Sequence, residues 1–381
     1  MQLSYTIVAF SHLRWNFVYQ RPQHLLSRLA ATHPVVFVEE PEFDHDGPPR
    51  WERSNPHPNV TVYRPYTRVQ APGFHGEQCA ALEPLMAELI TDLGPANPLA
   101  WLYTPMALPL ALTLDPDAAV YDCMDELSLF LGAPPELLAL EAQLLDYADL
   151  VFTGGPSLYR AKQSLHPNVH CFSSSVDAGH FRLRGAAGDV REAEDQAELS
   201  HPRLGFYGVI DERLDLEIVE RLARAHPEWQ IVLVGPVVKI DPARLPREPN
   251  VHYFGQRSYE ELPRYLAGWD VCLLPFARND ATKFISPTKT LEYMAAELPI
   301  VSTPITDVAE PYGDIVYLGG TPEEFLAACE SAMSSSAEER ARRAAQMRQV
   351  LAGTSWDATV ARMEGLLTSV MAARTAQRVP A

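Results

Sequence analysis

A lysine and a glutamate stand three residues apart at Lys289 and Glu292, in a short amphipathic segment that leads into an apolar, strand-like stretch. Residues three apart share one face of a helix, so these two side chains can reach the same ligand. The start of a helix also offers backbone N–H groups and a positive dipole end, which suit phosphate. A cation for a diphosphate and a carboxylate for a ribose diol would bind a nucleotide sugar, with Ser286 and Thr290 beside them. The alternative is a surface Lys–Glu pair on an ordinary crossover helix.

Polar and aromatic residues crowd the segment 11–24, directly after the first strand-like run. Ligands of open α/β sheets bind beyond the C-terminal ends of the strands, so this segment is a second candidate site. The residues that we expect to contact an acceptor or donor there are Arg14, Trp15, Gln20 and Arg21. In the structural alternative, Pro22 occupies the first position of a helix and Trp15 staples the loop to the core.

Three carboxylates follow a later strand-like run, at Asp122, Asp125 and Glu126. One of them could act as a general base that deprotonates an acceptor hydroxyl. Asp125 is the first choice for this base and Asp122 is the second. Asp125 could instead cap the next helical turn, with Glu126 complementing the helix dipole. His12 is a rival base, although a lone histidine in a loop more often has a structural role.

Short β-rich runs alternate with helical patterns along the whole chain, which is typical of parallel α/β architecture. The strands predicted in the first half are Tyr5–Phe10, Val35–Glu39, Val60–Tyr63, Ala100–Tyr103, Ala118–Asp122, Asp149–Thr153 and Val169–Phe172. The strands predicted in the second half are Arg203–Tyr207, Gln230–Val234, Val251–Phe254, Val271–Leu274, Ile300–Thr303 and Ile315–Leu318. Two sets of six or seven strands predict two doubly wound, Rossmann-like domains and not one large sheet.

The composition shifts between these two sets. Residues 185–202 begin Gly-Ala-Ala-Gly and continue as an acidic, polar stretch without strong periodicity, so we expect a linker or exposed insertion there. The N-terminal domain would then span residues 1–184 and the second domain residues 203–355. The closing segment 356–381 carries apolar residues at a helical period up to about residue 373, which predicts a terminal helix.

The 381 residues are 47% apolar and 21% charged, as in a soluble globular protein. The formal net charge of −18 argues against a nucleic-acid binder but leaves room for peripheral docking to a membrane through one face. The five scattered cysteines, without CxxC spacing, indicate neither a disulfide framework nor a zinc site. Neither a signal peptide nor a run of 18 apolar residues is visible, so we expect a cytoplasmic protein, with the inner face of the membrane as a further possible location.

The order and spacing of these motifs resemble the sugar-nucleotide glycosyltransferases of the GT-B architecture, especially the family 4-like (group 1) enzymes of bacterial capsule and exopolysaccharide synthesis. Beside the Lys289/Glu292 segment, the resemblance is carried by Arg14 with Tyr19–His24, Tyr121–Glu126, Ser175–Asp177 with Phe181, Gly205–Gly208, Leu233–Pro236 and Tyr253–Gly255. It implies two Rossmann-like domains facing a cleft, with the donor nucleotide sugar on the second domain and the acceptor on the first. It also implies that the terminal helix returns to the first domain.

The resemblance assigns roles to loops of the second half. The loop of Gly208 would approach the diphosphate and bring Arg213, the only basic residue nearby. Arg213 could instead be a surface residue that pairs with Asp211 or Asp215. Further nucleotide contacts would come from Gly235, Gln256 and Arg257. In xanthan-type glucuronosyltransferases, which the region of Asp125 resembles, an aspartate of the first domain serves as the base.

Two positions depart from the family pattern. The typical Glu-x7-Glu pair has its second glutamate at Glu292, but its first position is Phe284. The missing carboxylate leaves the stereochemical outcome open, while Lys289 matches a lysine that some inverting relatives direct at the pyrophosphate. The first loop also lacks the glycines that the family often has there, which favours a site built from side chains.

The sequence therefore predicts a glycosyltransferase that moves a sugar from a nucleoside-diphosphate sugar, with UDP expected, to a hydroxyl of a glycan or lipid-linked acceptor. The helix dipole and basic side chains can stabilise the leaving diphosphate, so we expect neither a metal nor another cofactor. One alternative is a nucleotide-sugar epimerase of the same architecture, which would turn over without an acceptor. Another is a catalytically silent nucleotide-sugar-binding or scaffold subunit of polysaccharide assembly.

Overall fold

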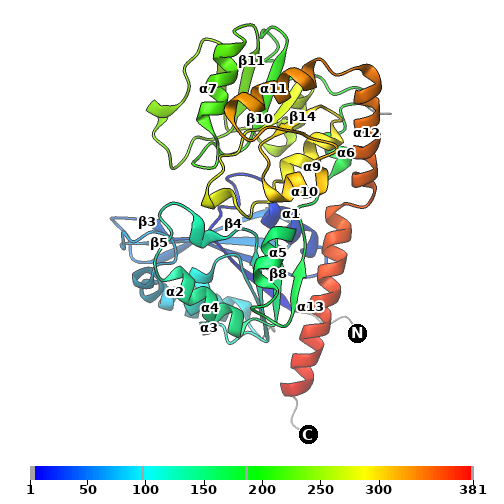
Figure 1. Ribbon diagram of the computed structural model, residues 1–381. Helices are drawn as coiled ribbons and strands as arrows, with labels where there is room; N and C mark the ends of the chain where they lie inside the picture. The colour runs from blue at the N-terminus through cyan, green and yellow to red at the C-terminus, as the bar shows by residue number, and fades with distance from the viewer. Residues whose placement is uncertain (1–4, 96–97, 185–187, 379–381) are drawn as a thin grey trace. The chain divides into compact units, whose positions relative to one another are not determined.

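The computed structural model describes residues 5–95, 98–184 and 188–378, and the chain divides into two compact units (Figure 1). Unit 1 comprises Met1–Ser173 and Trp356–Ala381, and unit 2 comprises Ser174–Ser355. Each unit is built on one mainly parallel sheet with helices packed against it. The predicted α/β fold class with two Rossmann-like doubly wound domains is confirmed.

The sheet of unit 1 has the order β3-β5-β2-β1-β6-β7-β8-β9, with β4 paired outside β5. All of its described pairs are parallel except β4 with β5. Its strands are β1 (Thr6–Ser11), β2 (Val35–Glu39), β3 (Glu42–Phe43), β4 (Arg50–His57), β5 (Val60–Thr67), β6 (Pro98–Leu102), β7 (Ala118–Cys123), β8 (Leu150–Thr153) and β9 (Val169–Cys171). Strands β1 and β7 are buried at every position, as expected of parallel strands covered on both faces. The strand order reverses between β1 and β6, so the loops after these strands open at the switch point.

The helices of unit 1 connect these strands and include the C-terminal one. They are α1 (Arg21–Leu29), α2 (Gly76–Leu93), α3 (Leu108–Thr113), α4 (Leu137–Tyr147), α5 (Pro156–Lys162) and α13 (Trp356–Arg378), with 3₁₀ turns η1 (Pro105–Ala107) and η2 (Leu127–Leu129). The terminal helix α13 packs against α1, and its apolar residues join the core of unit 1. That core is formed around β1, β2, β6 and β7 with aromatic side chains such as Phe37 and Trp101.

The sequence did not predict β3 and β4. Strand β4 is eight residues long and lies at the sheet edge, where seven of its eight side chains are exposed. Its sequence therefore shows no alternation of apolar and polar residues, which is the signal by which a strand is recognised. β3 has only two residues and is held by β5 alone.

The sheet of unit 2 has the order β12-β11-β10-β13-β14-β15, and all its described pairs are parallel. Its strands are β10 (Arg203–Tyr207), β11 (Gln230–Val234), β12 (Val251–Gly255), β13 (Val271–Leu274), β14 (Ile300–Ser302) and β15 (Tyr317–Leu318). Its helices are α6 (Ala178–Phe181), α7 (Leu216–Ala225), α8 (Leu262–Leu266), α9 (Thr288–Ala295), α10 (Thr306–Tyr312), α11 (Pro322–Met333) and α12 (Ala337–Ala352), with 3₁₀ turns η3 (Pro242–Arg244), η4 (Tyr259–Glu261) and η5 (Asp280–Thr282). This is the strand order of a Rossmann fold, with α7 packed on α11 and α9 packed on α6 and α12.

The segment predicted as a linker has a different place in the structure. Residues 185–187 lie outside the described part of the chain, but residues 188–202 pack within unit 2. Gln196 is fully buried and donates to the backbone of Tyr265 at 2.9 Å, while Trp269 Nε1 donates to Gln196 Oε1 at 3.1 Å. The unit boundary lies between Ser173 and Ser174, before the position expected after residue 184. Polar composition alone did not reveal these buried contacts.

Candidate functional site

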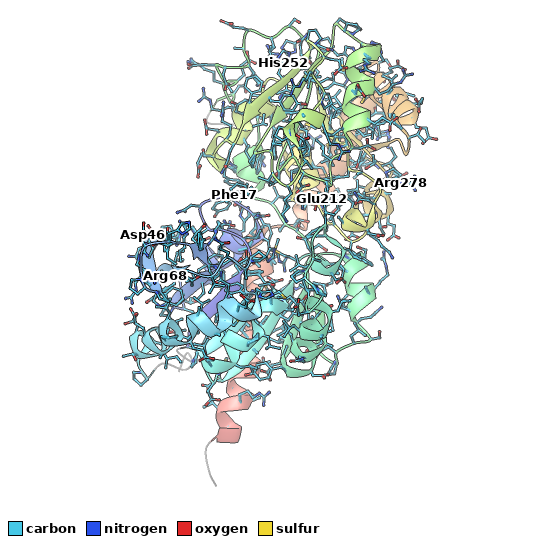
Figure 2. All side chains as sticks on the ribbon, turned by 90° about the vertical axis from the view of Figure 1, so that its left-hand side faces the viewer. Phe17, Asp46, Arg68, Glu212, His252 and Arg278 are labelled. Carbon is cyan, nitrogen blue, oxygen red and sulfur yellow. The ribbon has the colours of Figure 1, made fainter. Side chains whose placement is uncertain are left out.

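The strand order of unit 2 reverses between β10 and β13, so the loop after β10 and the loop from β13 into α9 open next to each other. Figure 2 shows Glu212 of the first loop and Arg278 of the second at one end of unit 2, with His252 near the start of β12 at the other end. Asn279 Nδ2 donates to the Glu212 carbonyl at 2.9 Å and joins the two loops. Three predicted donor residues belong to these elements, namely Gly208, Lys289 and Glu292.

Lys289 lies directly over the Cα of Gly208. A Cβ at Gly208 would stand 2.2 Å from Lys289 Cε and 2.8 Å from Nζ, and its φ of +140° favours glycine. Gly235, at φ +150°, approaches the Gly208 carbonyl so closely that a Cβ would lie 1.9 Å from that oxygen. The lysine Nζ is 5.8 Å from the centroid of the Phe206 ring. The two glycines therefore let a cation lie close against the backbone at the end of the sheet.

Glu292 is 6% exposed, and its Oε2 accepts a hydrogen bond of 2.6 Å from the Tyr207 hydroxyl. Burial raises the pKa of Glu292 above its ordinary value, while the Tyr207 hydrogen bond and the charge of Lys289 oppose that rise. The negative charge of Asp177 acts in the same direction as burial. Tyr207 thus orients a carboxylate that can accept hydrogen bonds from a diol.

Helix α9 begins after Pro287, and no described side chain caps its first turn. The N–H groups of a first turn lack partners within the helix and favour an anion. Thr290, in this turn, is 1% exposed, and its hydroxyl has no hydrogen-bond partner in the described parts of the chain. Ser286 presents its carbonyl to Ser174 Oγ at 2.8 Å. The structure therefore groups the four predicted residues Ser286, Lys289, Thr290 and Glu292 around one helix start.

The predicted arginines of unit 2 are bound to carboxylates of the protein. Arg213 Nη2 lies 2.7 Å from Asp211 Oδ2, and its Nε donates to the same carboxylate, which is the alternative that the sequence left open. Arg257 Nη2 contacts Asp195 at 2.8 Å, and Gln256 beside it is exposed. Lys289 is the predicted cation that the structure places against Gly208.

In unit 1, Arg21 and Asp122 form a buried ion pair. Their exposed fractions are 3% and 0%, and the guanidinium donates three hydrogen bonds to the carboxylate at 2.9, 3.1 and 3.2 Å. Burial disfavours the charge of Arg21, but the Asp122 carboxylate outweighs this effect and raises the pKa of Arg21. A base or an acceptor contact must reach the surface. The structure therefore corrects two expectations, because neither Asp122 nor Arg21 is placed to touch an acceptor.

Asp125 lies half-buried in the loop after β7, and its neighbours fix that loop. Glu126 Oε2 contacts Lys162 Nζ at 2.7 Å, and the same Nζ lies 2.7 Å from Glu141 Oε1. Lys162 is 4% exposed, so this ion-pair group is internal. A Cβ at Gly154 would lie 2.6 Å from the backbone oxygen of the residue before Asp125. Asp125 thus stays the candidate base, on a loop anchored by its neighbours.

The acceptor-side loop after β1 is held by contacts of its own. Arg14 Nη2 pairs with Glu42 at 2.9 Å, and its side chain is 26% exposed. Trp15 is 8% exposed and packs edge-on against a phenylalanine of β2, with ring centroids 5.0 Å apart, as the structural alternative expected. Gln20 caps α1 through a reciprocal capping box. His12 is half-buried in the same loop.

Two residues that shape these sites, Tyr207 and Lys162, were not predicted from the sequence. Tyr207 lies within a quoted motif, but its partner Glu292 is 85 residues later, so no local pattern joins them. Lys162 carries a weak signal, because it is the only lysine in the sequence of unit 1. A single lysine in a domain that otherwise uses arginine could have been singled out.

The described residues contain no group of three or more His, Cys, Asp or Glu side chains arranged to hold a metal ion. This holds although the chain has two Asp-x-Asp triplets, at Asp44–Asp46 and Asp115–Asp117. A search of the described helices also finds none with the length and apolar character needed to cross a membrane.

Part of this chain matches a family of known proteins. Residues 201–335 match the family model described as glycosyl transferases group 1. A protein of Bacillus subtilis (strain 168), provisionally named teichuronic acid biosynthesis glycosyltransferase TuaH, is 26% identical over 278 residues, which cover 68% of this chain and 69% of the relative.

Solved structures share the fold over nearly the whole chain. The sucrose-phosphate synthase of Thermosynechococcus elongatus superposes with a TM-score of 0.71 at 15% identity, covering 97% of this chain and 100% of its own. HepE of Anabaena, in complex with UDP and glucose, has a TM-score of 0.67 at 16% identity, with 96% and 100% covered. The E. coli trehalose-6-phosphate protein bound with UDP-2-fluoro glucose has a TM-score of 0.70 at 14% identity, with 96% and 99% covered. Residues 201–335 thus match group 1 glycosyl transferases, and the chain has the GT-B fold of the solved structures.

Proposed function

We propose that this enzyme transfers a sugar from a UDP-sugar to a hydroxyl of a glycan or lipid-linked acceptor in polysaccharide biosynthesis. The observation that carries the proposal is the start of α9, where Lys289 lies over Gly208 and Glu292 is held by Tyr207. Lys289 and the helix dipole would stabilise the leaving diphosphate, and Glu292 would accept hydrogen bonds from the ribose diol. The solved neighbours with UDP, or with UDP-2-fluoro glucose, support the choice of nucleotide.

The acceptor would bind on unit 1 near the loop after β7. There Asp125 would take the proton of the attacking hydroxyl while the bond from the sugar to the diphosphate breaks. The name of the Bacillus subtilis relative supports a glycan or lipid-linked acceptor, which would bring the enzyme to the inner face of the membrane. We further propose that transfer needs no metal ion, since Lys289 and the start of α9 would stabilise the leaving group in this site.

Calorimetric titration of UDP, GDP and ADP tests the donor site. Wild type should bind UDP most tightly, and Lys289→Ala should weaken binding about 10- to 100-fold, because a hydrogen bond to a charged group contributes roughly 1.5–3 kcal/mol. The titration is repeated with EDTA, which should leave the affinity unchanged. Arg348→Ala is the matched control, since it removes one positive charge from an exposed ion pair with Glu297 in the same unit.

Equal loss of affinity in Arg348→Ala would show a general charge effect and remove Lys289 from the site. Failure of wild type to bind any of the three nucleotides would overturn the donor assignment. Binding of a UDP-sugar without any turnover would favour the scaffold alternative, and turnover to an isomeric UDP-sugar without an acceptor would favour the epimerase.

A further inference from the structure

The Arg-Pro-Gln-His start of α1 carries three polar side chains that are almost fully buried. Arg21, Gln23 and His24 are 3%, 1% and 1% exposed, so none of them faces a substrate. Burial of three such groups in one helical turn needs specific partners, because an unsatisfied buried polar group is costly. Their partners lie in three separate segments of unit 1.

Gln23 fixes the acceptor-side loop. Its Nε2 donates to the carbonyl oxygens of Trp15 at 2.7 Å and Val18 at 3.1 Å, and its Oε1 accepts from the Gln20 N–H at 3.1 Å. The backbone of residues 15–20 is thereby tied to the first turn of α1. A displacement of this loop must therefore be passed to the helix.

Arg21 holds the segment by which the chain leaves unit 1. Its Nη1 donates to the Phe172 carbonyl at 2.6 Å, while Asp122 occupies the rest of the guanidinium. Arg362 of α13 lies over the Phe172 ring at 5.0 Å. Only the exposed Ser173 separates Phe172 from unit 2, whose first residue, Ser174, is bonded to the residue before Pro287 at the start of α9.

His24 holds the segment by which the chain returns. Its ring stacks on Trp356, the first residue of unit 1 after the return, with centroids 4.6 Å apart and planes at 10°. The same ring makes a T-shaped contact with the Tyr19 ring, with centroids 4.7 Å apart and planes at 87°. Tyr19 is 39% exposed and belongs to the acceptor-side loop, whereas Trp356 is 1% exposed. The rings of Tyr19, His24 and Trp356 thus connect the surface of that loop to the segment by which the chain returns to unit 1.

We propose that Arg21 and His24 are positioning residues for sugar transfer, which tie the acceptor-side loop to both crossovers between the units. Because both connecting segments are fastened to one helix, movement of unit 2 during turnover acts on α1 and on the loop that it fixes. A substrate that orders Tyr19 then restricts the crossover at Trp356. The inference rests on the proposed function only in taking the acceptor as the ligand of this loop.

Hydrogen exchange of the full chain tests the route through the three rings. Tyr19→Ala removes an exposed ring and should speed exchange of the amides around residues 354–358. Phe43→Ala is the matched control, because Phe43 is also 39% exposed and meets His45 edge-on at 4.4 Å, away from either crossover. His24→Ala should have a larger effect than Tyr19→Ala, and His24→Phe, which keeps a stacked ring, should restore exchange close to that of wild type.

Kinetics separate positioning from a merely structural role. For the UDP-sugar that wild type consumes, Tyr19→Ala and His24→Ala should lower kcat by about 10- to 100-fold, as small misplacements do, and leave the calorimetric Kd for UDP unchanged. If His24→Ala does not fold, Tyr19→Ala carries the test.

The inference would be overturned if the amides of residues 354–358 exchanged as slowly in Tyr19→Ala as in wild type. It would also be overturned if Phe43→Ala accelerated their exchange as much as Tyr19→Ala does. An equal loss in kcat and in UDP affinity would overturn it as well. Failure of the proposed function has a different signature, since wild type would then bind no nucleotide whatever the exchange pattern.

Discussion

At the scale of single residues, the candidate donor site depends on the absence of one side chain and the orientation of another. Gly208 leaves the space that the Lys289 side chain occupies, and the Tyr207 hydroxyl holds one oxygen of Glu292. Both contacts join the C-terminal end of β10 to α9, although about 80 residues separate them in sequence. Each of these two contacts leads to a prediction about nucleotide binding that does not depend on the acceptor.

Gly208→Ala should reduce UDP affinity at least tenfold. The new Cβ would stand 2.2 Å from Lys289 Cε and must displace it, and the φ of +140° adds backbone strain of about 1–2 kcal/mol. Calorimetry and thermal unfolding measure the two effects. Gly179→Ala is the control, since a Cβ there meets nothing within 4 Å; unchanged UDP affinity in Gly208→Ala would show that Lys289 does not act from its observed position.

Tyr207→Phe should move the pH dependence of UDP binding upward. Glu292 must be ionised to accept two ribose hydroxyls, and its pKa already lies above the ordinary 4.5 because it is buried. Binding therefore weakens as pH falls through that raised pKa. Loss of the Tyr207 hydrogen bond, which lowers the pKa of Glu292, shifts the midpoint to higher pH.

Titrations between pH 5 and 8 compare the variant with wild type, so that ionisation of UDP itself cancels. In a Glu292→Gln background the Tyr207→Phe substitution should no longer shift the profile. Identical profiles for wild type and Tyr207→Phe would argue that Glu292 does not bind the nucleotide.

At the residue scale, the sequence predicts local geometry where the signal is local. The three-residue spacing of Lys289 and Glu292 placed both on one helix turn, as the structure shows. Sequence reasoning could not see that Arg21 and Asp122, 101 residues apart, would neutralise each other in the interior. Arg213 and Asp211 are only two residues apart, and their pairing was recognised as the alternative.

At the scale of elements, the loop after β7 is held in place by a lysine between two acids. Lys162 of α5 contacts Glu126 of that loop and Glu141 of α4, and Tyr121 of β7 donates to Glu141 at 2.8 Å. Burial disfavours the charge of Lys162, but Cys123 and the carboxylates of Glu126 and Glu141 outweigh burial and raise the pKa of Lys162. The group thereby joins two helices to the loop that carries Asp125.

Lys162→Met should destabilise the protein by about 3–5 kcal/mol, because it leaves the buried Glu141 and the half-buried Glu126 without their cation. Urea unfolding at pH 7 measures the change. The triple variant with Glu126→Gln and Glu141→Gln, which removes all three charges, should recover most of the loss. The pKa of Lys162 is raised in the folded protein, so its charge stabilises the fold fully at pH values below its ordinary pKa of 10.5. This contribution is lost only as the pH rises through the raised pKa. Equal stability of wild type and Lys162→Met would contradict the account.

Buried strands were easier to predict from the sequence than exposed ones. Buried parallel strands such as β10 and β11 are apolar runs, and their predicted bounds agree with the structure. The exposed edge strand β4 has no such run, and the segment 188–202 has a polar composition although it packs within unit 2. In both cases pairing with distant residues, and not local sequence, decides the structure.

At the scale of the whole molecule, two units of similar fold carry different parts of the proposed reaction. Unit 2 holds the residues that we propose to bind the donor, and unit 1 holds Asp125 and the loop that we propose to bind the acceptor. The number of strand sets predicted this division, whereas the boundary at Ser173 and Ser174 depends on contacts that the sequence does not display. We propose that both connecting segments between the units are anchored on α1, so that movement of unit 2 acts on the acceptor-side loop of unit 1.

The most direct measurement is the release of UDP from a panel of UDP-hexoses and UDP-hexuronic acids, with p-nitrophenyl glycosides as acceptors and mass-spectrometric detection of products. We predict that one UDP-sugar yields UDP and a glycoside one sugar heavier. Glu292→Gln should raise KM for the donor, and Asp125→Asn should lower kcat without changing UDP affinity. Tight binding of a UDP-sugar with neither UDP release nor a heavier glycoside would contradict the claim that this chain transfers sugar.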